Sequence, residues 1–496
     1  MERESGGIAG KIIAAVFLLI SAAFVGLLVY TKLIPTVIVA VVAVVLLIFV
    51  ILITILTWNQ HNIVRFVIGT ILAVLFSGLF IAGGIYLYKT TSTLSKISGV
   101  ETEIAQVGIY VRAQDSADSL NATSGYKYGI ITDLDRENTD KTLEEIKSEL
   151  GTEIQVQEYR GLTELIDGLR HEETGAIILN QAYIPVLEEI DGYGDIGSQI
   201  REISVKNVET VIETVNKPSE NENAGTQVQA ETETTGEIYT VYISGIDNRG
   251  GLVAKSRSDV NIIAVANTKT RQLLLVSTPR DYFVPLSISG GVPDKLTHAG
   301  IYGISVSMDT LGMLYGIDIN NYFRINFGGF INIIDALGGI TVESDYDFST
   351  SGFHYNKGSN YVNGEQALAF ARERYSFSEG DRQRGKNQMA VIQGVINKAL
   401  SPELLKNYSS ILSSLQGSFE TNISYEEIAR LLQQQLTEGG AWNIVSYSVD
   451  GTGDKQKPYS MSQPAYVMIP DYNTVDAAKE MIQQVKNGQT IAQPQG

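Results

Sequence analysis

Residues 238–281 read IYTVYISGIDNRGGLVAKSRSDVNIIAVANTKTRQLLLVSTPRD. Three short apolar runs in this stretch are rich in β-branched residues and bounded by turn signals: Tyr239–Ile246, Val260–Ala266 and Gln272–Ser277. Such runs are typical of buried strands. Charged residues border these runs, namely Asp247, Arg257, Asp259, Arg280 and Asp281. Strands of one sheet can bring such residues together, so the stretch predicts two carboxylates for a divalent cation beside arginines for a phosphate ester or pyrophosphate.

The composition of the 496-residue chain argues against several classes of protein. The chain has 37 Lys and Arg against 55 Asp and Glu, a formal charge of −18, and no cysteine. So acidic a protein argues against a nucleic-acid partner, because phosphate backbones need basic patches. The lack of cysteine excludes disulfides, thiolate metal sites and cysteine catalysis. The length predicts two or three domains.

Three uncharged apolar stretches lie near the N-terminus: Ile12–Tyr30, Thr36–Thr57 and Phe66–Tyr88. Crossing a bilayer takes about 20 apolar residues, so we predict three transmembrane helices over residues 12–88. Arg3 and Lys11 precede the first span and favour a cytoplasmic N-terminus, residues 1–11. The expected location is therefore the cell membrane, as a multi-pass protein whose large C-terminal portion is extracytoplasmic.

The remainder of the chain divides at a polar linker, residues 217–236. Before the linker, residues 99–215 alternate expected strands (128–132, 154–159 and 176–180) with expected amphipathic helices (141–150 and 162–171). This alternation predicts a small accessory domain with a parallel sheet, in which Thr139 or Asp140 and then Gly151 cap the first helix. We find no catalytic constellation in it.

After the linker, residues 238–472 are expected to form the main α/β domain, and residues 473–496 a C-terminal tail. Beyond the three opening strands, we expect further strands at 322–327 and 340–343. The expected helices of this domain are 305–315, 330–337, 363–370, 425–436 and one that ends near residue 400.

A second group of charged residues lies in the stretch ARERYSFSEGDRQRGKNQ, residues 371–388. If residues 371–375 are extended, Arg372 and Arg374 point to one face. The helix expected next carries three polar residues on one face: Asp381, Arg384 and Gln388. Clustered guanidiniums can hold a pyrophosphate by paired hydrogen bonds. The alternative is a solvated charge run with internal salt bridges.

Asp247 and Asp259 are the predicted metal ligands, because the loop between two paired strands can fold their carboxylates together. Oxygen ligands in a chain without cysteine suit Mg²⁺ or Mn²⁺ rather than zinc. For Asp247 alone, the role of a turn residue is the stronger alternative. For His298, a packing or surface position is a stronger interpretation than a catalytic base. No Walker loop, GxGxxG motif or GxSxG elbow is evident, so we predict no nucleotide and no serine nucleophile.

Several ordered motifs make the main domain resemble the LytR-CpsA-Psr family. They are SGID at 244–247, SRSDVNII at 256–263, STPRD at 277–281, DKLTHA at 294–299, NFGGFINIIDALGGI at 326–340, and NGEQALAFARER at 363–374 followed by DRQRGKNQ. The resemblance runs from Ile238 to about Leu400. The three spans and the accessory domain are similar to those of capsule-locus members of the CpsA kind. The resemblance implies a mixed-sheet α/β catalytic domain with an apolar lipid pocket.

The resemblance also implies roles for individual residues. Asp247 and Asp259 would bind the divalent ion, and the residues implied in catalysis are these two with Arg280, Arg372 and Arg374. The pyrophosphate of the substrate would be held by Arg257, Arg280, Arg372, Arg374 and Arg384, with Asp381 and Gln388 completing the pocket. The role of Arg382 stays open.

The implied reaction transfers a glycan phosphate, here a capsular polysaccharide, from an undecaprenyl-pyrophosphate carrier to peptidoglycan. Capsule assembly proteins are further expected partners. We expect residues 305–315 and 330–337 to line the lipid channel, unless they are ordinary core. One alternative function is a transcriptional attenuator of capsule genes, which the acidic charge and the predicted topology disfavour. The other is a polyprenyl-pyrophosphate hydrolase or lipid binder, which the sequence does not distinguish from a transferase.

Overall fold

The computed structural model describes residues 5–32, 34, 36–58, 62–100, 102–212, 238–246, 255–399, 401, 419–461 and 463–493. The chain forms two compact units. The first comprises residues 1–99, 400–416 and 423–441, and the second comprises residues 100–399, 417–422 and 442–496. Asp247 lies outside the described residues, so its predicted role as a metal ligand is not tested.

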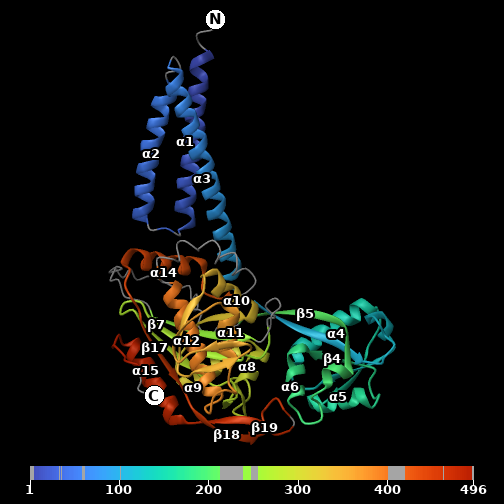
Figure 1. The fold of residues 1–496 in the computed structure, drawn as a ribbon. Helices are drawn as coiled ribbons and strands as arrows, with labels where there is room; N and C mark the ends of the chain where they lie inside the picture. Colours follow the sequence, from blue (N-terminus) through green and yellow to red (C-terminus); the bar gives the residue numbers. More distant parts are fainter. Residues whose placement is uncertain are drawn as a thin grey trace, which may run out of the picture. The chain divides into compact units, whose positions relative to one another are not determined.

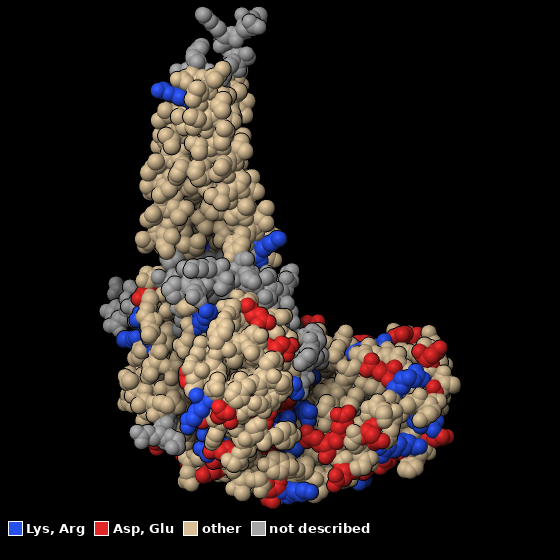
Figure 2. Space-filling model, in the orientation of Figure 1, with Lys and Arg blue, Asp and Glu red and all other residues tan. Residues whose placement is uncertain are grey.

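The first unit contains three long apolar helices and one amphipathic helix. They are α1 (Ser5–Thr31), α2 (Thr36–Trp58), α3 (Ile63–Ile97) and α14 (Tyr425–Glu438). Within the first three, the segments Ile8–Thr31, Thr36–Trp58 and Ile63–Lys89 are long and apolar enough to cross a membrane, which confirms the three predicted helices. Phe24 of α1 stacks on Phe80 of α3, with ring centroids 5.3 Å apart. In Figure 2 these helices are free of charged side chains along most of their visible length.

The accessory domain, part of the second unit, is built on a five-stranded sheet with the order β3-β2-β4-β1-β5. The strands are β1 (Thr102–Arg112), β2 (Lys127–Ile131), β3 (Gln155–Tyr159), β4 (Ala176–Asn180) and β5 (Ile200–Val211). The helices are η1 (Leu120–Thr123), α4 (Arg136–Leu150), α5 (Leu162–Arg170), η2 (Gln181–Tyr183), α6 (Ile184–Glu188) and α7 (Ile196–Gln199). Strands β2, β3 and β4 are parallel, as predicted. Strands β1 and β5 were not predicted, and β1 is antiparallel to both of its neighbours, so the sheet is mixed.

The start of α4 differs from the prediction. Its N-cap is Asp135, in the left-handed region at φ 54°, and not Thr139 or Asp140. The Asp135 carboxylate accepts hydrogen bonds from the side-chain amides of Asn138 (2.5 Å) and Asn180 (2.8 Å), and the partner on β4 is 45 residues away in the chain. A local pattern does not reveal such a partner. Gly151 caps the other end at φ 63°, as predicted.

The main domain is organised around a six-stranded sheet with the order β16-β11-β6-β7-β8-β17. Its strands are β6 (Ile238–Ile246), β7 (Val260–Asn267), β8 (Gln272–Ser277), β11 (Asn321–Asn326), β16 (Phe419–Thr421) and β17 (Asn443–Ser448). Strands β6, β7 and β8 are consecutive and antiparallel. Strands β11 and β17 join parallel to β6 and β8. The three opening strands and the mixed α/β fold class are therefore confirmed.

Helices cover both faces of this sheet (Figure 1). They are α8 (Leu296–Tyr302), α9 (Ile304–Tyr315), α10 (Phe327–Ala336), α11 (Gly364–Arg372), α12 (Asp381–Ala399) and α15 (Tyr472–Lys486). Helices α8, α9 and α15 contribute to the core on one face, which we call the closed face. Helix α12 covers part of the other face, which we call the part-covered face. Helix α11 packs against α12, and α10 packs against α11. Four two-stranded antiparallel sheets complete the domain: β9 (Phe283–Pro285) with β10 (Pro293–Lys295), β12 (Ile340–Ser344) with β15 (Gly358–Val362), β13 (Phe348–Thr350) with β14 (Phe353–Tyr355), and β18 (Gly451–Gln456) with β19 (Ala465–Pro470).

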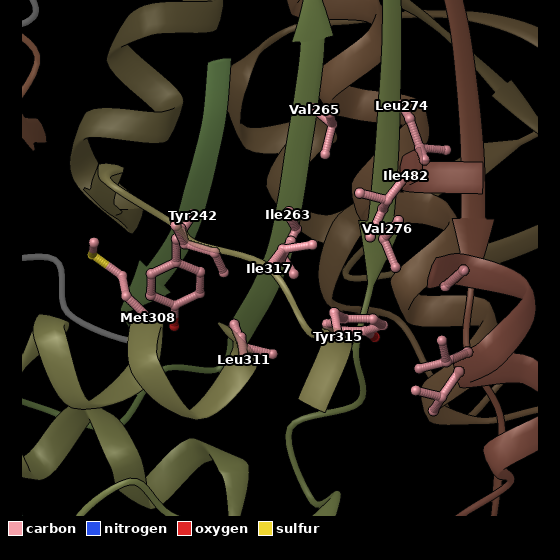
Figure 3. Close-up of a cluster of buried hydrophobic side chains, with 14 of the residues drawn as sticks. Tyr242, Ile263, Val265, Leu274, Val276, Met308, Leu311, Tyr315, Ile317 and Ile482 are labelled. Atoms are coloured by element: carbon pink, nitrogen blue, oxygen red, sulfur yellow. The ribbon is translucent and has the colours of Figure 1, made fainter. Parts of the chain in front are cut away.

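The closed face carries a continuous apolar core (Figure 3). Ile263, Leu274 and Val276 of the sheet, together with Leu311 of α9, are all fully buried there. Helix α15 contributes Val475, Ala478, Ile482 and Val485 to the same core. The predicted C-terminal tail, residues 473–496, is therefore wrong for the part that forms α15, which packs into the core of this domain.

The accessory and main domains share apolar and ionic contacts within the second unit. One apolar cluster joins Ile190 of the accessory domain to Ile301 and Met461 of the main domain. Glu103 of β1 accepts hydrogen bonds from the backbone N–H of Ile304 (3.1 Å), and its carboxylate pairs with Arg324 at 2.7 Å. Both charged side chains are only 3% exposed. The accessory domain is thus held against the main domain by buried groups.

Candidate active site

The structure brings Asp259 and Arg280 together at one edge of the main sheet. Asp259 immediately precedes β7, and Arg280 follows β8 by three residues. Because these strands are antiparallel and in register at Ile262 and Ser277, both residues emerge at the same edge. Arg280 Nη1 lies 2.9 Å from Asp259 Oδ1. Strand β6 ends beside the start of β7, where Gly245 pairs with Val260.

Backbone hydrogen bonds tie four of the sequence motifs together at this edge, those that begin at residues 244, 256, 277 and 294. Ser258 donates its N–H to the carbonyl of Thr297 (3.1 Å), and Thr297 donates to the carbonyl of Arg280 (2.8 Å). Asp259 donates to the carbonyl of Gly245 (2.9 Å). A Cβ at Gly300 would overlap the carbonyl oxygen of Ser256, so this close approach requires glycine. These four motifs therefore form one rigid assembly.

The first turn of α12 lies close to the end of β8. A Cβ at Gly385 would lie only 2.8 Å from the Ser277 hydroxyl, so the helix approaches the strand closely at a position without a side chain. This packing brings Asp381 and Arg384, which form an ion pair, toward Arg280. Asp381, Arg384 and Gln388 share this helix, as predicted.

Burial and neighbouring charges shift the pKa of these groups. Burial alone would lower the pKa of Arg280, but the carboxylates of Asp259 and Asp281 more than offset this effect and raise it. Burial raises the pKa of Asp381 and lowers that of Arg384, although the two groups attract each other. Arg280 therefore stays positively charged. Burial disfavours the charged forms of Asp381 and Arg384.

Arg372 and Arg374 have different surroundings in the structure. Residues 371–375 are not extended, because α11 continues to Arg372 and Arg374 lies in the following loop. The Arg372 guanidinium lies 4.6 Å from the ring centroid of Phe327. Arg374 interacts electrostatically with Asp381 and Arg384, so it belongs to the charged cluster. Gln388 contacts the backbone, at 3.4 Å from the carbonyl of Ala371.

Three further basic residues have assigned partners. Arg257 pairs with Glu189 of the accessory domain. Arg382 Nη1 lies 3.2 Å from Asp450, which is outside the stretch 371–388, and 3.9 Å from Glu379, which is inside it. His298 is fully buried rather than at the surface, and its Nδ1 lies 2.7 Å from Asp294 Oδ1.

Asp281 and Lys295 also belong to the charged cluster, although no role was predicted for either residue. One oxygen of Asp281 lies 3.5 Å from Arg280 Nε, and the other lies 3.5 Å from Lys295 Nζ. Both residues are buried. Their position inside the motifs STPRD and DKLTHA was the available signal, since charged residues beside a buried strand need partners.

The donor set at this edge fits a hard divalent cation in its chemistry. Asp259 offers carboxylate oxygens, one of which contacts Arg280, and the chain has no cysteine. Among the described residues, no group of three or more His, Cys, Asp or Glu side chains could hold a metal ion. A metal here would therefore need Asp247 or further oxygen ligands.

The chain is similar in sequence to known proteins. A model of the LytR_cpsA_psr family matches residues 204–481, a segment that begins within β5. The chain is 34% identical over 222 residues to a polyisoprenyl-teichoic acid–peptidoglycan teichoic acid transferase TagU of Enterococcus faecalis, covering 44% of this chain and 72% of that protein. The TagU of Bacillus mycoides is 32% identical over 249 residues, or 50% and 80% of the two chains.

Two solved structures are also similar to the chain. The crystal structure of B. subtilis TagV is 26% identical, with a TM-score of 0.43, and covers 52% of this chain and 99% of that one. The structure of protein gbs0355 from Streptococcus agalactiae is 27% identical, with a TM-score of 0.44, and covers 52% and 91%.

Proposed function

The chain belongs to the LytR-CpsA-Psr family, and from this premise we propose that it is a membrane-anchored phosphotransferase that attaches a glycopolymer to peptidoglycan. We further propose that the polymer is a capsular polysaccharide and that its carrier is undecaprenyl pyrophosphate. The names of the TagU relatives support a lipid-linked glycopolymer and a peptidoglycan acceptor. The observation that carries the proposal is the 2.9 Å contact between Asp259 and Arg280 within a cluster of arginines.

The proposed reaction is a displacement at the phosphorus that bears the glycan. A sugar hydroxyl of peptidoglycan forms the new O–P bond, the bond to the bridging oxygen breaks, and polyprenyl monophosphate leaves. Arg280, Arg374 and Arg384 neutralise the charge that develops on the bridging and terminal oxygens. An aspartate, Asp247 or Asp259, accepts the hydroxyl proton. The same two residues would hold Mg²⁺ or Mn²⁺, which supplies further charge neutralisation when bound.

We propose that the prenyl chain packs against the part-covered face of the main sheet. Val241 and Ile243 of β6 and Phe323 and Ile325 of β11 are only partly buried there, and Phe323 is in register with Ile243. This arrangement supports α10, residues 327–336, as one wall, since Phe330 and Ile333 are also partly buried. Helix α9 does not fit that role, because its buried residues Met308, Leu311 and Tyr315 lie in the closed core.

The experiment uses the full chain in detergent, a lipid-linked glycan labelled at the glycan-bearing phosphorus, peptidoglycan and Mg²⁺. We expect the label to appear in peptidoglycan, and Asp259→Asn to abolish this transfer. The control is Asp476→Asn, which removes an exposed carboxylate that pairs with Lys479. Label released as phosphorylated glycan would indicate a hydrolase, and label that stays on the lipid in every sample would indicate a lipid binder.

We propose that the second unit lies outside the cytoplasmic membrane, because three spans after a cytoplasmic N-terminus lead out of the cell. A phosphatase reporter fused after Gly496 should be active on intact cells. An active cytoplasmic reporter at that position would instead favour the transcriptional alternative.

A further inference from the structure

An acidic side chain of the accessory domain contacts two cations of the main domain. Glu189 follows α6 directly, and its Oε2 lies 2.7 Å from Lys295 Nζ. Its other carboxylate oxygen pairs with Arg257 Nη1. One carboxylate therefore joins two basic residues that lie 38 positions apart in the main domain.

Buried neighbours hold Glu189 in place. The neighbouring residue, Ile190, belongs to the apolar cluster that also contains Ile301 and Met461 of the main domain. Lys295 is only 5% exposed, and an ammonium so deeply buried needs carboxylate partners. Asp281 supplies a second partner at 3.5 Å, but Glu189 is the nearer one.

The two basic residues paired with Glu189 are connected to the edge of the sheet that carries Asp259 and Arg280. Lys295 contacts Asp281, which contacts Arg280, which contacts Asp259. Arg257 stands two residues before Asp259, and Ser258 between them is fixed by hydrogen bonds to the hydroxyls of Tyr242 (2.8 Å) and Ser244 (2.6 Å). A carboxylate of the accessory domain thus lies at the end of a chain of alternating charges that reaches the candidate active site.

We propose that Glu189 is a positioning residue: the accessory domain uses it to hold Arg257 and Lys295 at the edge of the pyrophosphate-binding cluster. This inference rests on the proposed function of that site. A role as a competitor that the substrate displaces fits less well, because displacement would remove the nearer partner of a buried lysine. Glu189 and most of the accessory domain lie before residue 204, outside the segment that the family model matches.

The test compares Glu189→Gln with the wild-type full chain in detergent. The glutamine keeps the shape of the side chain and removes its charge. Two quantities are measured: the KM for the lipid-linked glycan and the Kd for geranylgeranyl pyrophosphate, a probe without glycan. We expect both to rise about tenfold, the effect of one charge-assisted contact, with little change in kcat. Glu189→Asp should recover part of the affinity.

Glu188→Gln is the matched control, because Glu188 is adjacent to Glu189 and also exposed but forms no ion pair with the described residues. It should leave KM, Kd and the melting temperature unchanged. An unchanged KM and Kd in Glu189→Gln, or tighter binding of the probe, would overturn the positioning role. A fall in kcat together with the melting temperature, at constant KM, would show a purely structural role and would also overturn it. If the wild-type chain bound no probe and transferred no glycan, the proposed function itself would fail.

Discussion

Neighbouring residues of β6 experience two different environments, because side chains alternate between the faces of a sheet. Tyr242 lies on the closed face and is fully buried among residues of β7, α9 and α15. Val241 and Ile243, on either side of it, lie on the part-covered face and are only partly buried. A fully packed face stabilises the fold, whereas a partly covered apolar face can accept a ligand. We therefore propose that the closed face mainly stabilises the fold and that the part-covered face binds the prenyl chain.

The largest expected effect is on the closed face. Ile263→Ala removes a fully buried side chain from the core of β7 and should lower the free energy of unfolding by about 2–5 kcal/mol. Thermal and denaturant unfolding of the detergent-solubilised chain measure this loss. The Kd for a prenyl pyrophosphate should stay the same for the folded fraction. A loss well below 1 kcal/mol would mean that this face is less tightly packed than the structure indicates.

At the edge where the two faces meet, Arg280→Gln should lower kcat/KM by about 100-fold, or about 2.7 kcal/mol. Arg280 is a positive charge beside Asp259, so in the proposed mechanism its loss removes stabilisation of the developing phosphate charge. Arg382→Gln is the control, because its guanidinium pairs with Asp450 and its role is open. An equal loss of kcat/KM in both variants would show that Arg280 contributes no more to the reaction than Arg382 does.

The matched substitution on the part-covered face is Ile243→Ala. The same atoms are removed as in Ile263→Ala, but from a partly buried side chain, so the stability loss should be about 1 kcal/mol. The affinity for a long-chain prenyl pyrophosphate should fall, while that for a short-chain analogue should not. If Ile243→Ala and Ile263→Ala behaved alike in both assays, the distinction between the faces would be lost.

The smallest expected effect is a pH dependence of stability that involves Glu189. Burial alone would raise the pKa of Glu189, but Lys295 and Arg257 more than offset it and lower the pKa. The ion pairs therefore contribute fully above the ordinary glutamate pKa of about 4.3, and the contribution is lost as the pH falls through the lowered value. The melting temperatures of the wild type and of Glu189→Gln should converge in acid. A constant difference down to pH 3 would contradict this assignment.

Much of the site could be predicted because its residues border strongly patterned strands. Asp259 and Arg280 flank β7 and β8, and antiparallel pairing of these strands places both at one edge. Arg372 shows the limit of such reasoning. The capping box at Asn363 predicts where α11 begins, but the continuation of that helix through Arg372 depends on packing against α10 and α12.

The sequence by itself determined the three apolar spans and the strands β6, β7 and β8, because the hydrophobic period is a local property. The predicted linker at residues 217–236 lies outside the described residues. Only the tertiary structure decided that β1 and β5 complete the accessory sheet, that α15 belongs to the closed core, and that Glu189 reaches Lys295. Each of these depends on partners about 100 or more residues away. The free energy of such a contact depends on both of the segments that form it, so the sequence of either segment alone does not predict the contact.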